Sequence, residues 1–328
     1  MSKNNFNFTI IDDTDDATLE NIKPVYDFLY EKKIFITKTV WVHPPRDKHS
    51  KGDSLQRPEY LEYIKELSAK GFEIALHNVG SGDYTRDEIL DGIEEFKSKL
   101  GFYPKIHINH SYNKDSIYGG FKRFNWPFSW IVKKLYPQYS SGFEGEIEGS
   151  DYFWGDKHKE LIKYSRNHEF YNINTLKIDT LMPYTDAKRS KYANYWFSST
   201  FAPNQKVFRS VLSDSNIDKL SKSGGTSILY THFGYFMQNG ELDKGFIDSI
   251  NYLCSKKNGV FIPVSNLLDS IAEKRKLKGK KPFPKITYFK KFRYELLHLI
   301  NRVYYRKFNK IDDYAFKGFD NEMFLENK

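Results

Sequence analysis

The sequence predicts an α/β fold built on a largely parallel sheet with crossover helices. Strand-like and helix-like segments alternate through the first 120 residues, and the alternation returns between residues 226 and 274. Polar residues able to bind a metal or transfer a proton follow several of the predicted strands. An alternating β–α order places successive strands in parallel, in either a doubly wound sheet or a closed barrel.

The first half of the chain gives the clearest pattern of elements. β-Branched and apolar runs predict strands at residues 6–11, 34–42, 72–76 and 105–108. Apolar residues at helical spacing predict helices at residues 17–32, 58–70 and 85–100. Thr85 and Glu88 have the spacing of a capping box, and Gly71 and Gly101 stand where glycine commonly ends a helix. Each of the first three predicted strands is therefore followed by one crossover helix.

The second half divides into three parts. Residues 112–225 are aromatic and without clear periodicity, which predicts a long irregular insertion on the substrate side. Strands are then predicted at residues 227–230 and 260–264, and helices at residues 243–256 and 265–274. We expect one domain over residues 1–272, followed by a basic helical tail over residues 273–328.

The positive charge of the chain is concentrated in that tail. Residues 273–310 hold 14 Lys or Arg and two Glu, so they carry +12, while the whole chain carries +9 and the remainder −3. Apolar residues recur at helical spacing between Tyr288 and Val303. The tail is expected either to hold the protein against an anionic membrane or to pack on the domain with a solvated basic face. With an acidic remainder and no nucleic-acid-binding module, a nucleic-acid partner is not expected.

The start of the chain bears on its compartment. Residues 1–7 are polar and lead directly into the strand that carries Asp12, whereas a secretory signal needs an apolar stretch and a cleavage site. Cys254 is the single cysteine, which excludes an intrachain disulfide. We therefore expect a cytoplasmic protein, peripheral to the inner face of the membrane if the tail binds lipid.

Four polar clusters stand at the ends of predicted strands, where α/β folds collect ligands and catalytic groups. They are Asp12-Asp13, His77-Asn78, His107 to His110, and Thr231-His232. Taken singly, each has a structural explanation, as a turn that caps a helix or as a packed histidine. Taken together, they predict one site at the carboxyl edge of the sheet. Imidazole and carboxylate ligands favour Zn²⁺ there.

These motifs resemble the polysaccharide deacetylase family, the NodB-homology domain of carbohydrate esterase family 4. The resemblance covers residues 6–110 and 226–272. Its motifs are the strand with paired aspartates at residues 9–13, the stretch leading to a histidine at residues 69–78, the helix start at residues 84–89, and the strand end at residues 229–232. It implies a distorted or incomplete (β/α) barrel and a metal-dependent hydrolase that removes an N- or O-acetyl group from a sugar.

The sequence departs from the family pattern at the metal site. The family has a second metal histidine four residues after the first, where this chain has Ser81. The family's Arg-Pro-Pro-like motif is replaced by a segment with His107 and His110. The resemblance then implies Asp13 and His77 as metal ligands, with His110 as the expected third ligand and His107 as the alternative.

The remaining roles also follow from the resemblance. Asp12 would take a proton from the attacking water, and His232 would protonate the leaving group. Substrate contacts are expected from Asn78, Asn109, Trp154 and Trp196. The substrate is expected to be an acetylated sugar linked to a lipid or a nucleotide, a precursor of a surface polysaccharide or glycolipid. Because Ser81 breaks the usual metal triad, a non-catalytic carbohydrate-binding protein remains the alternative.

Overall fold

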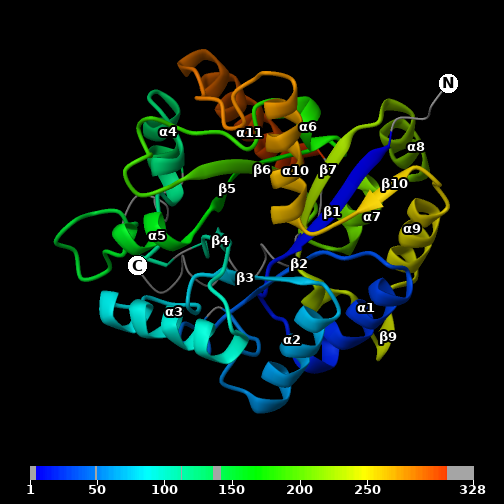
Figure 1. The fold of residues 1–328 in the computed structure, drawn as a ribbon, viewed down its shortest axis with the longest axis horizontal. Helices are drawn as coiled ribbons and strands as arrows, with labels where there is room; N and C mark the ends of the chain where they lie inside the picture. Colours follow the sequence, from blue (N-terminus) through cyan, green and yellow to red (C-terminus); the bar gives the residue numbers. More distant parts are fainter. Residues whose placement is uncertain (1–4, 49, 112, 136–141, 309–328) are drawn as a thin grey trace.

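Parallel strands form a closed barrel in the protein. The structure is a computed structural model that describes residues 5–48, 50–111, 113–135 and 142–308. The barrel strands are β1 (Phe6–Asp12), β2 (Thr37–Val40), β3 (Glu73–His77), β4 (Ile106–Ile108), β5 (Tyr164–Phe170), β6 (Tyr195–Phe201) and β7 (Thr226–Thr231). Each strand pairs in parallel with the next, and β1 also pairs with β7, which closes the ring (Figure 1). The predicted barrel is confirmed.

The barrel is distorted at the edge of β1. The first residues of β1, Phe6 to Phe8, pair with β10 (Gly259–Phe261), while its last residues, Ile11 and Asp12, pair with β2. Two strands therefore share one edge of β1. The remaining strands, β8 (Met237–Gln238) and β9 (Glu241–Leu242), form a separate antiparallel pair.

Helices cover the outside of the barrel (Figure 1). They are α1 (Leu19–Glu31), α2 (Pro58–Ala69), α3 (Arg86–Leu100), α4 (Phe128–Leu135), α5 (Gly155–Leu161), α6 (Thr175–Ile178), α7 (Gln205–Val211), α8 (Asp214–Ser223), α9 (Lys244–Cys254), α10 (Val264–Leu277) and α11 (Tyr288–Phe308), with 3₁₀ turns η1 (Gly120–Arg123) and η3 (Phe233–Tyr235). Both bonds of the predicted capping box between Thr85 and Glu88 are present. Gly101 ends α3 with φ of 87°, a left-handed conformation that glycine adopts without steric cost.

The alternation of side chains along β1 separates two hydrophobic cores. Phe8 and Ile10 point outward into the core beneath α1, α2 and α9, whereas Ile11 belongs to the core that includes the barrel interior. By the same alternation, Asp12 continues the outward set and Asp13 follows the inward set. This parity decides which carboxylate reaches the mouth of the barrel.

The prediction of an irregular insertion over residues 112–225 is wrong in part. That segment contributes β5 and β6, which complete the barrel wall, and helices α4 to α8. The sequence Tyr164–Phe170 reads YSRNHEF, in which five consecutive polar residues interrupt the apolar pattern. These polar side chains are buried or nearly buried by the barrel mouth and by α11, so neither the hydrophobic run nor the alternation typical of a strand appears.

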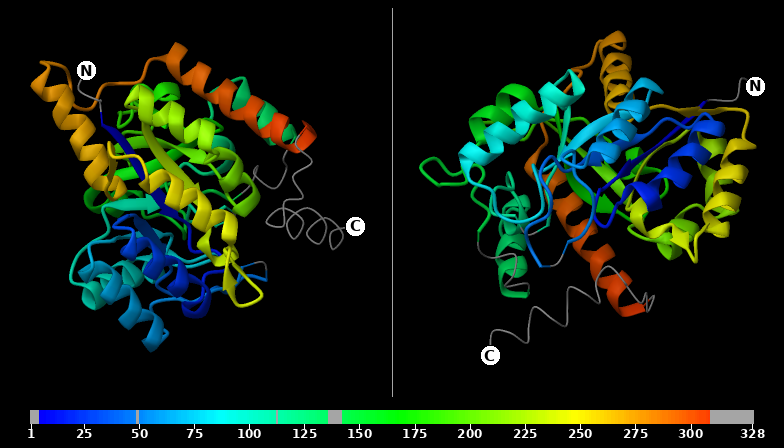
Figure 2. Two further views of the ribbon diagram at one scale, coloured as in Figure 1. Left: turned by 90° about the vertical axis from the view of Figure 1, so that its right-hand side faces the viewer. Right: turned by 90° about the horizontal axis from the view of Figure 1, so that it is seen from below.

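The predicted tail is also corrected where the structure describes it. The domain does not end at residue 272, because α10 continues to Leu277 and α11 packs along β5 (Figure 2). Tyr294, Glu295 and His298 of α11 are buried. Within residues 288–304 the helix is thus part of the domain, and residues 309–328 of the predicted tail lie outside the described ranges. Among the described residues, no helix is both long and apolar enough to cross a membrane.

Candidate active site

A cavity of about 150 Å³ opens at the carboxyl ends of the barrel strands. Asp13 and Asp15 from the loop after β1, His77 from the end of β3 and His110 from the loop after β4 line one side. Arg166 and Glu169 of β5, Tyr230 of β7 and residues of α11 line the other. Asp13, His77 and His110, which stand at or after the ends of three different strands, thus line one cavity.

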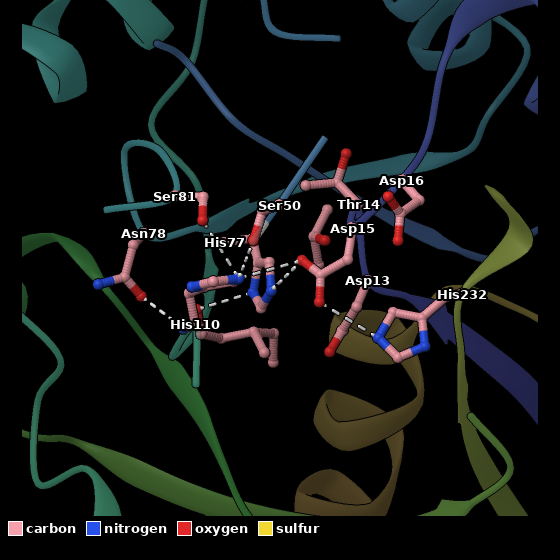
Figure 3. A network of polar contacts seen from close by, with 12 residues as sticks. Asp13, Thr14, Asp15, Asp16, Ser50, His77, Asn78, Ser81, His110 and His232 are labelled. Atoms are coloured by element: carbon pink, nitrogen blue, oxygen red, sulfur yellow. Dashed lines mark hydrogen bonds and ion pairs between the residues drawn. The ribbon is translucent and has the colours of Figure 1, made fainter. Parts of the chain in front are cut away.

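Asp15, His77 and His110 form a group that could hold a metal ion (Figure 3). Their ligand atoms all lie within 4.8 Å of one another. Oδ1 of Asp15 is 3.2 Å from Nε2 of His77 and 3.5 Å from Nε2 of His110. Two ligands of a tetrahedral Zn²⁺ at about 2.0–2.1 Å are separated by roughly 3.3 Å, so these spacings suit zinc.

The hydrogen bonds of the two imidazoles leave the facing nitrogens available. Nδ1 of His77 lies 3.1 Å from the carbonyl of Ile108, and Nδ1 of His110 lies 3.0 Å from Oδ1 of Asn113. Both partners are acceptors, since the Asn113 oxygen also accepts from the backbone N–H of Gly82, so both Nδ1 atoms donate. Each Nε2 then presents a lone pair toward Asp15, the usual arrangement of metal-bound histidines.

Two buried atoms of this group lack a hydrogen-bond partner in the described structure. They are Nε2 of His77 and Oδ1 of Asp15, which face each other. Burial raises the pKa of Asp15, but electrostatic interactions with the imidazoles of His110 and His77 and a hydrogen bond from His232 hold this pKa well below its usual range. An ionised carboxylate facing unsatisfied imidazole nitrogens is a donor set that fits a divalent cation.

Asp13 lies beside this group but is held by an arginine. Nη1 and Nη2 of Arg166 donate to Oδ1 at 3.0 Å and to Oδ2 at 2.5 Å, a bidentate pair that is almost fully buried. Glu169 in turn contacts Arg166, Arg123 and Arg302. Burial raises the pKa of Glu169, but these arginines and His298 lower it well below its usual range. The cavity wall thus orients the side chain of Asp13 with an arginine that Glu169 supports.

His232, which directly follows β7, contacts the carboxylate of Asp15. Its Nε2 is 3.3 Å from Oδ2 of Asp15, and its Nδ1 lies 2.9 Å from the carbonyl of Pro203. Burial lowers the pKa of His232, but the hydrogen bond and charge of Asp15, together with the charge of Asp13, raise it to about 9. Both ring nitrogens therefore face acceptors, as an imidazolium requires.

Gly234 allows the loop after His232 to pass close to Asp16, because a Cβ at position 234 would come within 2.6 Å of the Asp16 carbonyl.

Asp12 does not reach the cavity. It forms a fully buried ion pair with Lys38, whose Nζ lies 3.0 Å from Oδ2, and it accepts hydrogen bonds from Tyr26 and from the backbone N–H of Phe233. Burial raises the pKa of Asp12 against the opposing effect of Lys38. The structure thus directs Asp12 to the helix layer, away from the position expected of a base that contacts water.

His107 also points away from the cavity. Its neighbours Ile106 and Ile108 face the barrel interior, so His107 faces outward and packs edge-on against Trp154 and His158. The structure therefore places His107, the alternative metal ligand, away from the cavity. His110, three residues later in the loop, is the histidine that joins His77 and Asp15.

The predicted substrate contacts separate into two groups. Asn109 lines the cavity. Its side-chain amide also donates to the backbone carbonyl of Ile117 and accepts from the backbone N–H of the same residue. Asn78, Trp154 and Trp196 are buried and do not line the cavity. The side-chain oxygen of Asn78, Oδ1, accepts a hydrogen bond from the backbone N–H of His110. Asn78 therefore positions the loop that carries His110. The two tryptophans belong to the packed cores and offer no face to a sugar.

Ser81, at the position of the family's second histidine, lies under His110. Its hydroxyl is 3.5 Å from Nε2 of His110 and donates to Asp47. The imidazole of His110 therefore lies directly beside the side chain at position 81.

Sequence reasoning missed Asp15, Arg166 and Glu169. Asp15 belongs to the same acidic run as Asp12 and Asp13, and the parity of β1 could have indicated that the later aspartates turn inward. Arg166 and Glu169 stand in a strand that the apolar pattern does not reveal, so no local signal marked them.

No family model and no curated protein matches this chain. Solved structures do match. Puue allantoinase shares 11% identity over 81% of this chain and 90% of its own, with a TM-score of 0.46. The catalytic domain of a peptidoglycan N-acetylglucosamine deacetylase from Eubacterium rectale shares 12% identity over 80% and 90%, with a TM-score of 0.39. A family 4 acetyl xylan esterase from Clostridium thermocellum, in complex with a cobalt ion, shares 12% identity over 84% and 94%, with a TM-score of 0.38.

The latter two proteins act on acetyl groups, like the family that the sequence motifs resemble. The sequence identities are near 12% and the TM-scores lie below 0.5. The chain's own strand order and side chains define its class. It is a closed parallel α/β barrel with a candidate metal group, a carboxylate–arginine pair and a histidine at the carboxyl edge.

Proposed function

We propose that this protein is a metal-dependent hydrolase that removes an N- or O-acetyl group from a sugar. The observation that carries the proposal is the group of Asp15, His77 and His110 beside the Asp13–Arg166 pair, all on one cavity. The motifs imply Asp12 as the base and Asp13 as a metal ligand, whereas the proposal assigns each role to an aspartate later in the chain. Asp13 takes the role of base, and Asp15 that of metal ligand.

Hydrolysis of an acetyl group needs a proton acceptor for water and a proton donor for the leaving group. The ionised carboxylate of Asp13, fixed in one orientation by Arg166, is the acceptor in this proposal. His232, whose pKa is raised to about 9, holds the proton for the departing amine or alkoxide. Arg166 donates one hydrogen bond to each oxygen of Asp13, which leaves a lone pair on each oxygen to accept the proton.

Asp15, His77 and His110 would hold the divalent cation, for which Zn²⁺ suits the donor set. Such an ion lowers the pKa of bound water and polarises a carbonyl oxygen. The backbone carbonyl of Ile108 and the side chain of Asn113 keep the two imidazoles in the tautomer that offers Nε2.

The proposed substrate is an acetylated sugar linked to a lipid or a nucleotide, a precursor of a surface polysaccharide or glycolipid. The proposed place of action is the cytoplasm or the inner face of its membrane. The basic composition of residues 273–310 supports the membrane part of this proposal.

The test combines metal analysis with acetate release. The purified protein should bind one equivalent of Zn²⁺ or Co²⁺ and release acetate from a member of a panel of N- and O-acetylated sugars. Asp15→Asn should lose both metal and activity. Metal binding without acetate release from any member would favour the alternative, a carbohydrate-binding protein with a deacetylase-like fold.

A further inference from the structure

The exposed hydrophobic side chains of this protein are concentrated on two helices. Of the 14 large hydrophobic side chains that are exposed among the described residues, ten belong to residues 126–135 or 288–304. They are Trp126, Trp130, Leu135, Tyr288, Phe289, Phe292, Leu296, Ile300, Val303 and Tyr304, here called the two-helix surface. Phe289 is 83% exposed and Trp126 is 74% exposed. Soluble proteins seldom expose apolar side chains in such a concentration without a partner.

Contacts between the two helices make this one surface. The ring of Phe128 in α4 packs on that of Phe292 in α11 at 4.8 Å between centroids. The Tyr288 hydroxyl donates to the Trp126 carbonyl at 3.3 Å. The right-hand view of Figure 2 shows α4 and α11 projecting past the barrel on the same side.

The charge of the two-helix surface is one-sided. Residues 118–135 hold four Lys or Arg and no Asp or Glu, and the only acidic residue in residues 288–308 is Glu295, which is buried. Lys133, Lys134, Lys290 and Arg293 are exposed beside the hydrophobic side chains. Tryptophan, aliphatic side chains and lysine without carboxylates are the composition of segments that lie in the interface of an anionic membrane.

The opposite faces of the same two helices line the catalytic cavity. Val132 of α4 and His298, Leu299 and Arg302 of α11 all contribute to its wall. A molecule held at the two-helix surface would therefore be next to the cavity that contains Asp15 and His77. Because the surface adjoins the cavity, a membrane bound there would also bring lipid-linked molecules close to the cavity.

We infer that the two-helix surface binds an anionic lipid bilayer, so that the cavity receives the sugar of a lipid-linked substrate from the membrane. The surface itself stands independently of catalysis, whereas the lipid linkage of the substrate rests on the proposed deacetylase function. Of the lipid- and nucleotide-linked sugars left open above, the two-helix surface selects the lipid-linked one.

The experiment is flotation of the full chain with vesicles of phosphatidylcholine alone or of phosphatidylcholine with phosphatidylglycerol. The full chain should float with the anionic vesicles and much less with the neutral ones. The variant Phe289→Asp/Ile300→Asp should bind anionic vesicles at least about ten-fold more weakly. The control Leu277→Asp/Phe102→Asp, which changes exposed hydrophobic residues elsewhere, should bind as the parent does.

Charge is tested with a second pair of variants. Lys133→Glu/Lys134→Glu should weaken binding to anionic vesicles at least about ten-fold, because each basic residue near such a surface contributes to the attraction. Lys206→Glu/Lys219→Glu, on exposed positions of α7 and α8, should leave binding unchanged.

Equal flotation of the surface variants and the parent would overturn the inference. Two other occupants would also overturn it. One is a second copy of the chain, shown by a solution dimer that Phe289→Asp dissociates. The other is the chain's own residues 309–328, shown by vesicle binding that appears only in a chain ending at Phe308.

Acetate release from a water-soluble acetylated sugar, measured on the same variants, separates this inference from the proposed function. Vesicle binding without acetate release keeps the membrane surface and rejects the deacetylase. Acetate release without vesicle binding does the reverse. For the lipid-linked sugar itself, the surface variants should turn over substrate in vesicles at least about ten-fold more slowly, while their rate on the soluble sugar is unchanged.

Discussion

Three neighbouring aspartates have different environments because a strand and its turn direct them differently. Asp12, the last residue of β1, faces the helix layer and pairs with Lys38. Asp13 faces the barrel mouth and pairs with Arg166, and Asp15 meets His77 and His110. Identical side chains within four residues thus divide into a buried ion pair, a candidate base and a candidate metal ligand.

The first prediction separates Asp13 from Asp12. Asp13→Asn should lower kcat by about 10²–10⁴-fold while bound zinc is retained, because the amide cannot accept a proton and Asp15 still holds the metal. Asp12→Asn should instead destabilise the fold by about 3–5 kcal/mol, because Lys38 is left buried without its counter-charge. Steady-state kinetics and urea unfolding of both variants provide the measurement.

The double variant Asp12→Asn/Lys38→Met is the control for the buried pair. It removes both charges, so much of the lost stability should return. If Asp12→Asn kept full stability and lost turnover, Asp12 would be the base that the family motif implies.

The second prediction concerns the third metal ligand. His110→Ala should weaken zinc binding by at least about 100-fold, because one of three protein ligands is removed. His107→Ala should change zinc affinity much less, because His107 faces Trp154 and His158 outside the cavity. Zinc retained after dialysis against a chelator, measured for each variant, distinguishes them. Full zinc retention by His110→Ala would remove His110 from the site.

The third prediction is a dependence of stability on pH that arises at Asp115. Burial raises the pKa of Asp115 to about 7, although the Asn78 amide, which donates to it at 2.6 Å, opposes this rise. Between about pH 4 and pH 7 the native state keeps a proton that the unfolded state has lost. The contribution of Asp115 to the unfolding free energy therefore falls as pH rises through this window.

Asp115→Asn should remove that dependence, because an amide does not titrate and its oxygen can still accept from Asn78. Relative to the parent, the variant should gain on the order of 2 kcal/mol of unfolding free energy between pH 5 and pH 8. Urea unfolding of both proteins at the two pH values measures the difference. A gain of zero would mean that Asp115 is ionised throughout, and Asp115→Ala, which leaves the Asn78 amide unpaired, should be less stable than Asp115→Asn.

At the residue scale, the sequence indicates a candidate site residue where that residue stands at or just after the end of an apolar strand. His77, His110 and His232 were found this way, since the apolar run before each one locates the carboxyl edge of the sheet. Arg166 was missed because it lies within a strand of mixed polarity and meets Asp13 from a distance of 153 residues in sequence. A contact of that separation has no local signature.

At the scale of elements, the sequence predicts those whose boundaries are set by local chemistry. The capping box at Thr85 begins α3, and Gly101 in the left-handed conformation ends it. The spacing of apolar residues indicates the helix α11. This spacing does not show which side of the helix packs against the barrel. Tyr294 and His298 are buried against the barrel, while Phe289 and Ile300 are exposed, and all four belong to the same run of apolar and basic residues.

The fourth prediction tests the orientation of α11. Tyr294 is 1% exposed and packs against Phe170 of β5 with ring centroids 6.1 Å apart. Tyr294→Ala should lower the unfolding free energy by about 3–5 kcal/mol, because a large buried side chain leaves a cavity. Phe289→Ala on the exposed side should change it by less than about 0.5 kcal/mol. Equal effects in urea unfolding would contradict this orientation of the helix.

At the scale of the whole molecule, the barrel and α11 share buried charges as well as hydrophobic surface. Nζ of Lys291 pairs with Asp186 at 2.5 Å, and Arg302 pairs with Glu169 at 3.0 Å. Glu169 supports Arg166, which orients Asp13. The C-terminal helix is therefore connected to the candidate base through three successive ion pairs, Arg302–Glu169, Glu169–Arg166 and Arg166–Asp13. Its sequence alone, rich in basic residues, suggests a separate tail.

The fifth prediction is that a chain ending at residue 286 loses stability and activity together. Such a chain lacks α11, so Asp186 and Glu169 each lose one of their cationic partners and the packed ring of Phe170 is uncovered. Loss of the buried side chain of Tyr294 alone costs about 3–5 kcal/mol, a large share of the total stability of many domains. Thermal unfolding should show a transition at least about 10 °C lower, or none.

The matched control is a chain ending at Phe308, which keeps both ion pairs and should unfold near the parent temperature. Because Asp15, His77 and His110 all precede the deletion, any folded fraction of the shorter chain should still bind zinc while its acetate release falls with the orientation of Asp13. A shorter chain with the parent's transition temperature and rate would show that α11 is the separable tail its composition suggests.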